Sequence, residues 1–416
     1  MRVSLDGPTA IAVGMLGGVM RSLAKLLLIA LVGVLSSPAA AADGELEVTQ
    51  VAPSCKGGSS DATTYGNNRR LALSLAGRTL AVYDPHGSGV QLKWKDAGTA
   101  EWSKQTQGAV SDGQLLGEDI PNDRTASIVV DSAGQTAWVV WTGYTFDMIS
   151  EVRMRRLTDL DNASGPTIGR EVVLRDGGMG NVRIDAVYHD ANVYITWTER
   201  TATTTYKLMA ARLSDLSESP TLTDVAVLWT GSAKVATATL VPTDSGLRVA
   251  ARTGKLRIYS HKGGASWTEG SGGASLNGKA RPSAVALDSG AILVAAQSDF
   301  KNDVVKVWRF TNSGKGAPEL EMTTGAGYAE PTLVSTGVED ALVVMVASDD
   351  TLVSRARTMD SWASGDTIEL SVPDGDYAWP NALREPTNGR LQVLVDGKPC
   401  PTSAKQQEVL HLSRPL

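Results

Sequence analysis

One hairpin pattern recurs seven times along the chain, at intervals of about 52 residues. Each copy has an alternating strand, a tight turn and a second apolar strand, which is typical of antiparallel β-structure. A repeat of this period indicates a chain built from similar supersecondary units. The copies are RLALSLAGRTLAVYD (70–84), TASIVVDSAGQTAWVVWT (125–142), RIDAVYHDANVYITWT (183–198), ATLVPTDSGLRVAART (238–253), PSAVALDSGAILVAAQ (282–297), PTLVSTGVEDALVVMVA (331–347) and PNALREPTNGRLQVLVDG (380–397).

The turn of each copy carries a residue that suits a tight hairpin. Glycine and asparagine adopt positive φ at low cost, which such turns require. We therefore expect a tight turn at the same place in every copy. The turn residues are Gly77, Gly134, Asn192, Gly246, Gly290, Asp340 and Gly389.

Further strands follow each hairpin. A third strand is visible in every copy, as in EVRMRRL (151–157), and a fourth in most, as in REVVLRD (170–176). Four antiparallel strands per unit, repeated radially, predict an all-β fold that is a seven-bladed β-propeller. A pair of β-sandwiches or a β-helix are the alternatives, and the regular interval favours the propeller over both.

The first strand of the predicted domain supplies the missing fourth strand of its last repeat. The seventh copy reaches Leu416 after three strands, and its fourth strand is missing. The opening ELEVTQV (45–51) is similar to the fourth strands ELEMTTG (319–325) and TIELSV (367–372). We expect it to pair with the last strand and close the ring, because an unpaired seam exposes a sheet edge.

The first 42 residues have the layout of a secretory signal peptide. A basic start, MRSLAK (20–25), precedes the apolar run LLLIALVGVL (26–35) and an Ala-x-Ala cleavage site before Asp43. The apolar run is too short to span a membrane. The prediction is a signal peptide over 1–42 and a single propeller domain over 43–416, secreted or periplasmic, with Met1 or Met20 as the start.

Charge and cysteine content bear on the partners and the compartment. The net charge of −6 argues against nucleic acid as a main partner, and we expect no membrane insertion. The two cysteines, Cys55 and Cys400, lie near opposite ends of the predicted domain. In an oxidising compartment the simple expectation is one disulfide across the last blade. Two free buried thiols are the alternative.

Three stretches are similar to a family motif. YSHKGGASW (259–267) resembles the Asp-box (BNR repeat) of sialidase-like propellers, with Ser260, Gly264, Ser266 and Trp267 in place and Lys262 where Asp belongs. KDAGTAEW (95–102) keeps the Asp, Gly and Trp of the box, and RTMDSW (357–362) keeps the Asp and the Trp. In that family the box shapes a hairpin between the third and fourth strands, so the resemblance implies fold and no chemistry.

The same family includes enzymes. Sialidases are six-bladed, with an arginine triad, an acidic Asp and a Tyr/Glu nucleophile pair, whereas this chain has seven repeats. Their Arg-Ile-Pro motif is matched only in part by RID (183–185) and RPS (281–283). The catalytic residues are therefore unknown, and none is carried over from the family.

A ligand site is predicted where the innermost strands begin. This start position lies nine or ten residues before the turn and is basic in several copies, with Arg69 and Arg70 near it in the first. Guanidinium groups match carboxylates, and a Trp beside them can stack on a sugar. The alternative is that each arginine is solvated or paired with a neighbouring acid. The candidate ligand-binding residues are Arg124, Arg183, Arg281, Glu330 and Trp379.

Acidic loops and histidines add weaker candidates. Loops between second and third strands carry acids such as Asp84, Asp147 and Asp303, and paired carboxylates can hydrolyse glycosides. The four histidines fall in four different repeats, and DLDNASG (159–165) has Arg170 where a calcium loop needs Glu. We expect no metal and no cofactor.

These features favour a secreted binding propeller, lectin-like or an interaction scaffold, that recognises a carbohydrate or an anion through one axial face. Its partner would be a glycan, an anionic small ligand or another extracellular protein. The alternative is a sialidase-like glycoside hydrolase, and a third hypothesis is a structural envelope component. We expect binding rather than catalysis, because propellers host many functions and no catalytic set is recognisable.

Overall fold

The structure is a computed structural model, and it describes one compact unit within Leu46–Leu416. No helix among the described residues is long and apolar enough to cross a membrane. The described residues are 46–52, 69–83, 90–103, 114–115, 124–144, 150–177, 180–232, 237–270, 274–275, 281–299, 304–313, 316–324, 330–347, 351–370, 378–386, 388–399 and 407–416.

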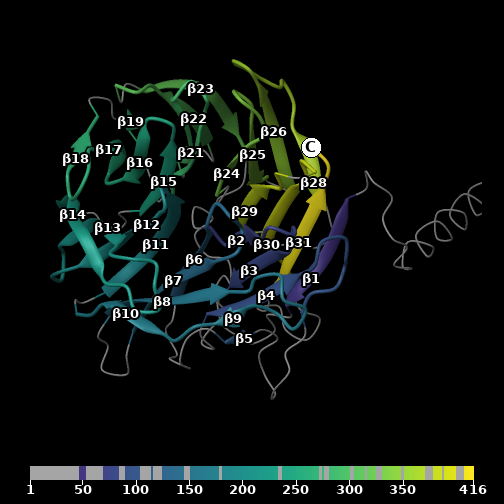
Figure 1. The fold of residues 1–416 in the computed structure, drawn as a ribbon. Coiled ribbons are helices and arrows are strands. Elements are labelled where there is room, and N and C mark those ends of the chain that lie inside the picture. Colours follow the sequence, from purple (N-terminus) through teal and green to yellow (C-terminus); the bar gives the residue numbers. More distant parts are fainter. Residues whose placement is uncertain are drawn as a thin grey trace, which may run out of the picture. The chain divides into compact units, whose positions relative to one another are not determined.

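Seven antiparallel sheets follow one another around a central axis (Figure 1). Each sheet is one blade, and the innermost strands of successive blades pack against each other. Blades 1 to 6 each use consecutive strands, whereas blade 7 combines strands from both ends of the unit. The predicted seven-bladed all-β propeller is confirmed.

The strands of blades 1 to 7 are given from the axis outward. The innermost strands are β2 (Leu71–Leu73), β6 (Arg124–Val130), β11 (Gly180–His189), β15 (Thr237–Thr243), β20 (Ser283–Ala286), β24 (Thr332–Ser335) and β29 (Ala378–Arg384). The second strands are β3 (Thr79–Tyr83), β7 (Ala137–Tyr144), β12 (Asn192–Arg200), β16 (Gly246–Arg252), β21 (Ile292–Asp299), β25 (Ala341–Val346) and β30 (Leu391–Pro399). The third strands are β4 (Gln91–Lys95), β8 (Ser150–Thr158), β13 (Tyr206–Leu213), β17 (Lys255–His261), β22 (Val304–Phe310), β26 (Leu352–Thr358) and β31 (Gln407–Arg414). The outer strands are β5 (Gln114–Leu115), β9 (Thr167–Ile168) with β10 (Val172–Arg175), β14 (Leu222–Gly231), β18 (Trp267–Glu269) with β19 (Ala274–Ser275), β23 (Gly316–Thr323), β27 (Ser361–Trp362) with β28 (Thr367–Leu370), and β1 (Glu47–Ala52).

The core lies between the blades. Seven apolar clusters of buried residues each join two successive blades, including blades 7 and 1. Side chains of β7 alternate between two of them: Val139 and Trp141 face blade 1, and Trp138 and Val140 face blade 3. Because successive side chains of a strand point to opposite faces, a blade buried on both sides needs strands that are apolar throughout. This explains the continuous apolar second strands.

The first turns show why several copies carry glycine. Gly134 has a φ of 67°, and a Cβ placed there would lie 2.5 Å from the backbone nitrogen of Leu75 in blade 1. In blade 3 the predicted turn residue was one to two residues too late: the left-handed residues are Asp190 (φ 48°) and Ala191 (φ 56°), and Asn192 already begins β12. In blade 6 the turn forms without a left-handed Asp340.

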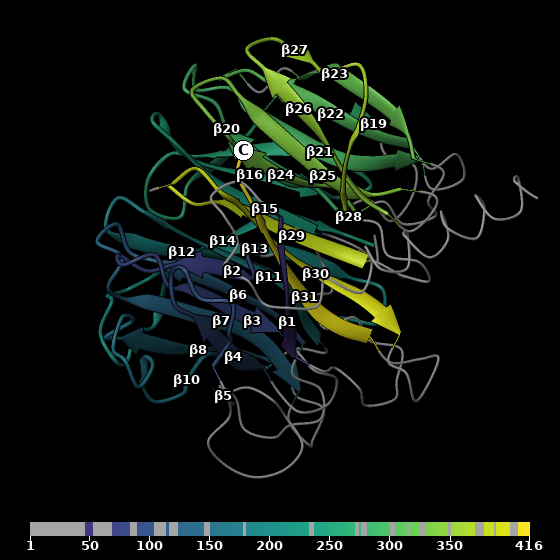
Figure 2. The same cartoon turned by 90° about the vertical axis from the view of Figure 1, so that its right-hand side faces the viewer.

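The opening strand closes the ring, as predicted. β1 runs antiparallel to β31, from Glu47 opposite Ser413 to Ala52 opposite Val409. Figure 2 shows blade 7 with β29, β30, β31 and β1 in order. Blade 1 also holds β1 through side chains, because Lys95 Nζ lies 2.7 Å from Glu47 Oε1 and Trp102 Nε1 donates to Thr49 Oγ1 at 2.9 Å. The seam is therefore closed by a ladder and by a second set of contacts.

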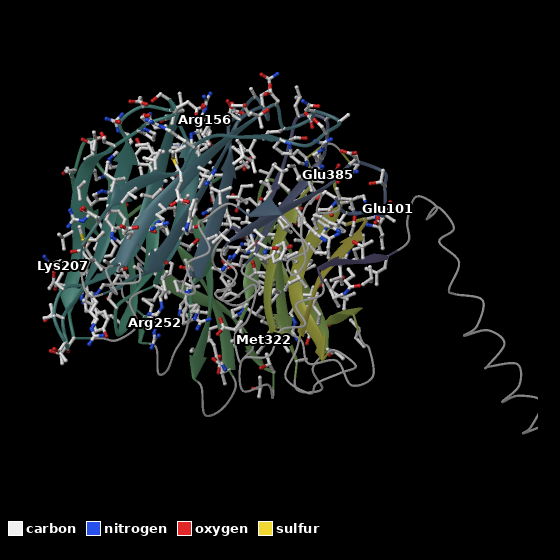
Figure 3. The ribbon with its side chains drawn as sticks, turned by 90° about the horizontal axis from the view of Figure 1, so that it is seen from below. Glu101, Arg156, Lys207, Arg252, Met322 and Glu385 are labelled. Carbon is white, nitrogen blue, oxygen red and sulfur yellow. The ribbon has the colours of Figure 1, made fainter. Side chains whose placement is uncertain are left out.

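The two faces of the ring differ in what they carry. The start face is where the innermost strands begin, and the turn face carries the first hairpin turns. Figure 3 views the ring from its side, with Arg252 and Met322 toward the start face and Arg156 and Glu385 toward the turn face. The three box-like stretches form hairpins after the third strands, with Lys95 bridged to Trp102, His261 to Trp267 and Arg357 to Trp362.

Candidate functional site

A belt of hydrogen bonds aligns the innermost strands. In several blades a short polar side chain accepts the backbone N–H of the next blade's innermost strand. This recurrence identifies one structurally equivalent position in each blade. The bonds run from Ala186 N to Ser127 Oγ (3.2 Å), from Leu240 N to Asp185 Oδ2 (2.8 Å), from Leu333 N to Ser283 Oγ (2.9 Å) and from Arg70 N to Asn381 Oδ1 (3.0 Å).

Arg69 occupies the corresponding position in blade 1 and behaves differently. Its Nη1 lies 2.6 Å from Asp185 Oδ2 of blade 3, and its Nη2 donates to the carbonyl oxygen of Leu240 in blade 4 at 2.5 Å. Blades 1 and 4 stand far apart around a seven-bladed ring, so this side chain must reach across the axis. Asp185 is fully buried. The Arg69–Asp185 pair is therefore structural and links blade 1 to blades 3 and 4.

Two residues before these hydrogen-bonding side chains, at the start position, the backbone is strained in three blades. Thr125, Arg183 and Glu330 stand at this position in blades 2, 3 and 6, with φ values of 44°, 61° and 37°. Left-handed backbone is rare outside glycine and is unusual for a β-branched residue such as Thr125. Strained residues of this kind gather where a side chain must be aimed in a particular direction. Their recurrence in three blades makes the start face the candidate site.

The strand register changes the residue that occupies the start position of blade 2. Arg124 pairs with Thr142 just before a bulge in β6, as Val182 pairs with Thr198 just before a bulge in β11. Arg124 therefore corresponds to Val182, and the residue of blade 2 equivalent to Arg183 is Thr125. Thr125 lies nine residues before Gly134, as Arg183 lies nine before Asn192, whereas Arg124 lies ten before its turn, so counting back from the turn left an ambiguity of one residue.

Three arginines and one carboxylate from consecutive blades gather at the start face. Arg281 Nη1 of blade 5 lies 3.5 Å from Glu330 Oε1 of blade 6, and both side chains are largely buried. Arg252 ends the second strand of blade 4, opposite Thr237. Burial, and then the positive charges of Arg183 and Arg281, lower the pKa of Arg252 to about 10, while Glu330 opposes this shift. We call Arg183, Arg252, Arg281 and Glu330 the arginine cluster.

Arg252 is the unusual member of the arginine cluster. It is only 9% exposed, and its Nε and Nη1 have no hydrogen-bond partner among the residues that the structure describes. The Thr237 hydroxyl opposite it is also buried and has no partner within the same described ranges. Burying a charged donor without an acceptor is costly. An acceptor supplied by a ligand would remove that cost.

The predicted site residues are thus brought together in part. Arg183, Arg281 and Glu330 belong to one cluster, whereas the side chains of Arg124 and Trp379 lie outside the described part of the molecule. The loop acids Asp84, Asp147 and Asp303 and the pair Cys55 and Cys400 also lie outside it. The disulfide therefore stays a prediction.

Arg252 was not among the site residues predicted from the sequence. One signal was available, since this arginine ends the otherwise apolar strand GLRVAAR. Its neighbours in the cluster come from three other blades, so no local pattern connects them.

The loop of residues 159–165 binds the guanidinium of Arg78, which belongs to blade 1. Arg78 Nη1 donates to the carbonyl oxygens of Leu160 and Asn162, at 2.7 Å each, and Arg78 Nε lies 2.6 Å from Asp96 Oδ1. A guanidinium thus holds the carbonyls that a metal ion would otherwise gather. Across the described ranges, no group of three or more His, Cys, Asp and Glu residues is placed to hold a metal ion.

Comparisons with known proteins concern the fold. No protein-family model and no curated protein matches the sequence. Solved structures similar to this chain include a protein of unknown function from Dyadobacter fermentans, at 10% identity and a TM-score of 0.49, covering 71% of this chain and 95% of its own. The NanB sialidase from Streptococcus pneumoniae is 14% identical with a TM-score of 0.45, covering 87% of this chain and 70% of its own.

A lectin from Aleuria aurantia is similar as well, at 13% identity and a TM-score of 0.43, covering 66% of this chain and 91% of its own. Likenesses this distant carry no functional argument. The assignment of the chain to the β-propellers rests on its own sheet topology.

Proposed function

We propose that the protein is an exported binding propeller that recognises the acid group of a carbohydrate at the arginine cluster. The observation that carries this proposal is Arg252, a buried guanidinium beside two further arginines with two donor nitrogens that lack acceptors among the described residues. A carboxylate or another oxyanion would supply acceptors and balance the excess positive charge.

A carbohydrate acid suits the cluster better than a bare ion. Alongside the arginines, the buried Thr237 hydroxyl and the Glu330 carboxylate offer partners for neutral hydroxyl groups. A sugar acid presents an anion and hydroxyls on one rigid ring. Recognition of both by one cluster is the chemistry we infer.

Glycoside hydrolysis is the alternative and finds less support. It requires two acidic groups on either side of the scissile bond, or a comparable nucleophile and acid. Of the described residues that form the arginine cluster, one is a carboxylate, Glu330, and it lies 3.5 Å from Arg281. Binding without turnover therefore fits the described geometry better.

The test is calorimetric titration with the methyl glycosides of glucuronic acid and N-acetylneuraminic acid. Arg252→Gln should weaken binding by about 10- to 100-fold, because it removes a charge-assisted hydrogen bond. Arg200→Gln is the matched control, since Arg200 lies at the start-face end of β12 and donates to the backbone oxygens of Ala202 and Thr203. Equal affinity in both variants, or no binding of either acid to the wild type, would refute the proposal.

Catalysis and export are tested separately. Release of the fluorophore from a fluorogenic sialoside, lost in Glu330→Gln, would support the hydrolase instead. Export predicts that the mature chain begins at Asp43, which amino-terminal sequencing of secreted or periplasmic protein checks. Peptide mapping without reduction checks the predicted Cys55–Cys400 disulfide.

A further inference from the structure

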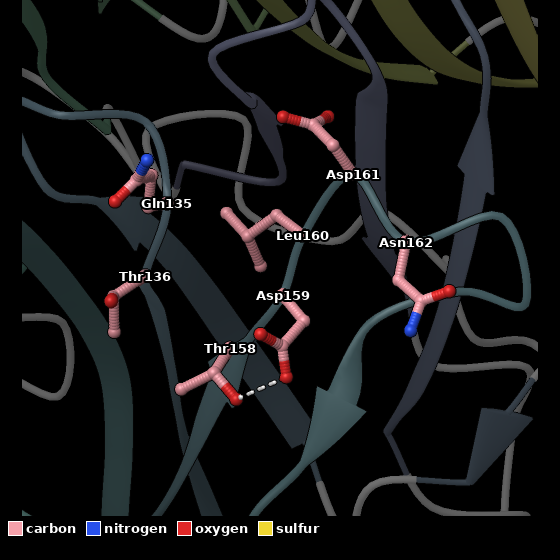
Figure 4. A pocket seen from close by; sticks show the side chains of 7 residues that line it. All are labelled: Gln135, Thr136, Thr158, Asp159, Leu160, Asp161 and Asn162. Carbon is pink, nitrogen blue, oxygen red and sulfur yellow. Dashed lines mark hydrogen bonds between the residues drawn. The ribbon is translucent and has the colours of Figure 1, made fainter.

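A pocket of about 530 Å³ opens on the turn face of blade 2, away from the arginine cluster (Figure 4). One wall is the turn between β6 and β7, with Gln135 and Thr136. The other is the loop after β8, with Asp159 and Asn162, and the buried side chain of Leu160 also lines it. We propose that this pocket is a second binding site, for a neutral saccharide.

The pocket lining contains donor and acceptor atoms that have no hydrogen-bond partner among the described residues. Asp159 Oδ2 accepts the hydroxyls of Thr158 (3.2 Å) and Thr167 (2.9 Å), whereas Oδ1 has no hydrogen-bond partner among the described residues. The side-chain amide of Gln135 and Nδ2 of Asn162 likewise have none in the described ranges. Hydroxyl groups donate to a carboxylate and accept from amides, so a polyol can satisfy all three.

The charge around the pocket disfavours ionic ligands. None of its lining residues is basic, which disfavours an anion. A cation would meet the guanidinium of Arg78 behind the loop, already bonded to the carbonyl oxygens of Leu160 and Asn162. The Asp161 carboxylate is held by the Ser74 hydroxyl and by the backbone N–H of Ala76 at 3.1 Å. A neutral ligand remains.

Both walls are fixed before any ligand arrives. Arg78 and Asp161 tie the loop to blade 1, and Leu75 N donates to the carbonyl oxygen of Gly134 at 2.8 Å. Asp131 Oδ1 accepts the backbone N–H groups of Gln135 (2.9 Å) and Thr136 (3.3 Å). A rigid pocket lowers the entropic cost of binding, which matters for ligands held mainly by hydrogen bonds.

The test is saturation-transfer NMR on the full chain with methyl α-glucoside, methyl α-mannoside, methyl α-galactoside and methyl N-acetyl-β-glucosaminide. At least one should bind, and Asp159→Asn should weaken it by about tenfold, because it replaces a charged acceptor. Asparagine tolerates left-handed backbone, which suits the φ of 51° at this position. Gln135→Ala should weaken binding less.

The matched control is Asp190→Asn, because Asp190 is also an exposed left-handed acid (φ 48°) in a turn-face turn, one blade away. It should leave affinity unchanged, as should Arg252→Gln on the start face. Absence of saturation transfer to all four glycosides would overturn the proposal. So would equal affinity in Asp159→Asn and wild type, or a calcium-induced rise in Tm that Asp159→Asn abolishes.

Discussion

Two buried arginines on opposite faces of the ring differ in whether the protein itself supplies a negatively charged partner. Arg357, near the turn face of blade 6, is 1% exposed; its Nε lies 2.9 Å from Glu319 and its Nη2 lies 3.2 Å from Asp360. Arg252, at the start face of blade 4, is 9% exposed beside two other arginines. One arginine is neutralised by the chain itself. For Arg252, two donor nitrogens have no acceptor among the described residues, which leaves them for a ligand.

The comparison makes opposite predictions for the two side chains. Removing a well-paired buried arginine takes a buried donor away from its carboxylates and costs stability. Removing a buried arginine without acceptors relieves a cost and should affect binding instead.

The largest expected effect is on Arg357. Arg357→Ala should lower the free energy of unfolding by about 3 kcal/mol, because it breaks a buried ion pair with Glu319 and removes the donor to the carbonyl oxygen of Glu339. Urea denaturation measures it. The control is Arg355→Ala, which removes an outlying pair with Asp366 and should cost under about 1 kcal/mol. Similar losses in the two variants would show that the Arg357 network adds little.

The next effect concerns a buried histidine whose neutral form is favoured. His411 of β31 is fully buried; burial, and then the positive charges of Lys95 and Arg390, hold its pKa well below the usual 6.5. The folded state thus binds fewer protons than the unfolded state below pH 6.5. Stability should therefore fall with decreasing pH there, at no more than about 1.4 kcal/mol per pH unit for this group.

His411→Gln should flatten that part of the pH–stability curve, measured by urea denaturation between pH 7 and pH 5. An unchanged slope would assign the acid sensitivity to other groups.

The smallest expected effect is the stability of Arg252→Leu. The free energy of unfolding should stay within about 0.5 kcal/mol of wild type or rise, because a buried charge without an acceptor is replaced by an apolar side chain. The same urea series measures it. A loss comparable to that of Arg357→Ala would mean that Arg252 has a structural partner, and the contrast between the two arginines would disappear.

The blade architecture was predictable because its determinants are local. Alternation over a few residues and turn residues at a fixed interval specify each hairpin, and the similarity of 45–51 to other fourth strands indicated the closure. The failures were also local and small. The left-handed turn of blade 3 uses Asp190 and Ala191, which no glycine signals, and the start position of blade 2 is Thr125, one residue closer to the turn than the predicted Arg124.

The candidate site was predictable only in outline. Arg183, Arg281 and Glu330 lie nine or ten residues before their turns, so the repeat itself placed them together. Arg252 comes from a second strand, and only the ring brings it to the others. The pocket at Asp159 depends on Arg78 and Asp161 joining two blades, which periodicity does not encode.

Closure by β1 has a consequence for the order of folding. Thr49 and His411 meet across the seam although 362 positions separate them in the chain. During synthesis β1 therefore has no partner for its backbone ladder until β31 has been made. The final pairing then joins the oldest and the newest parts of the polypeptide, and a chain truncated before β31 has nothing to pair with β1. Completion of the ring therefore depends on synthesis having passed β31.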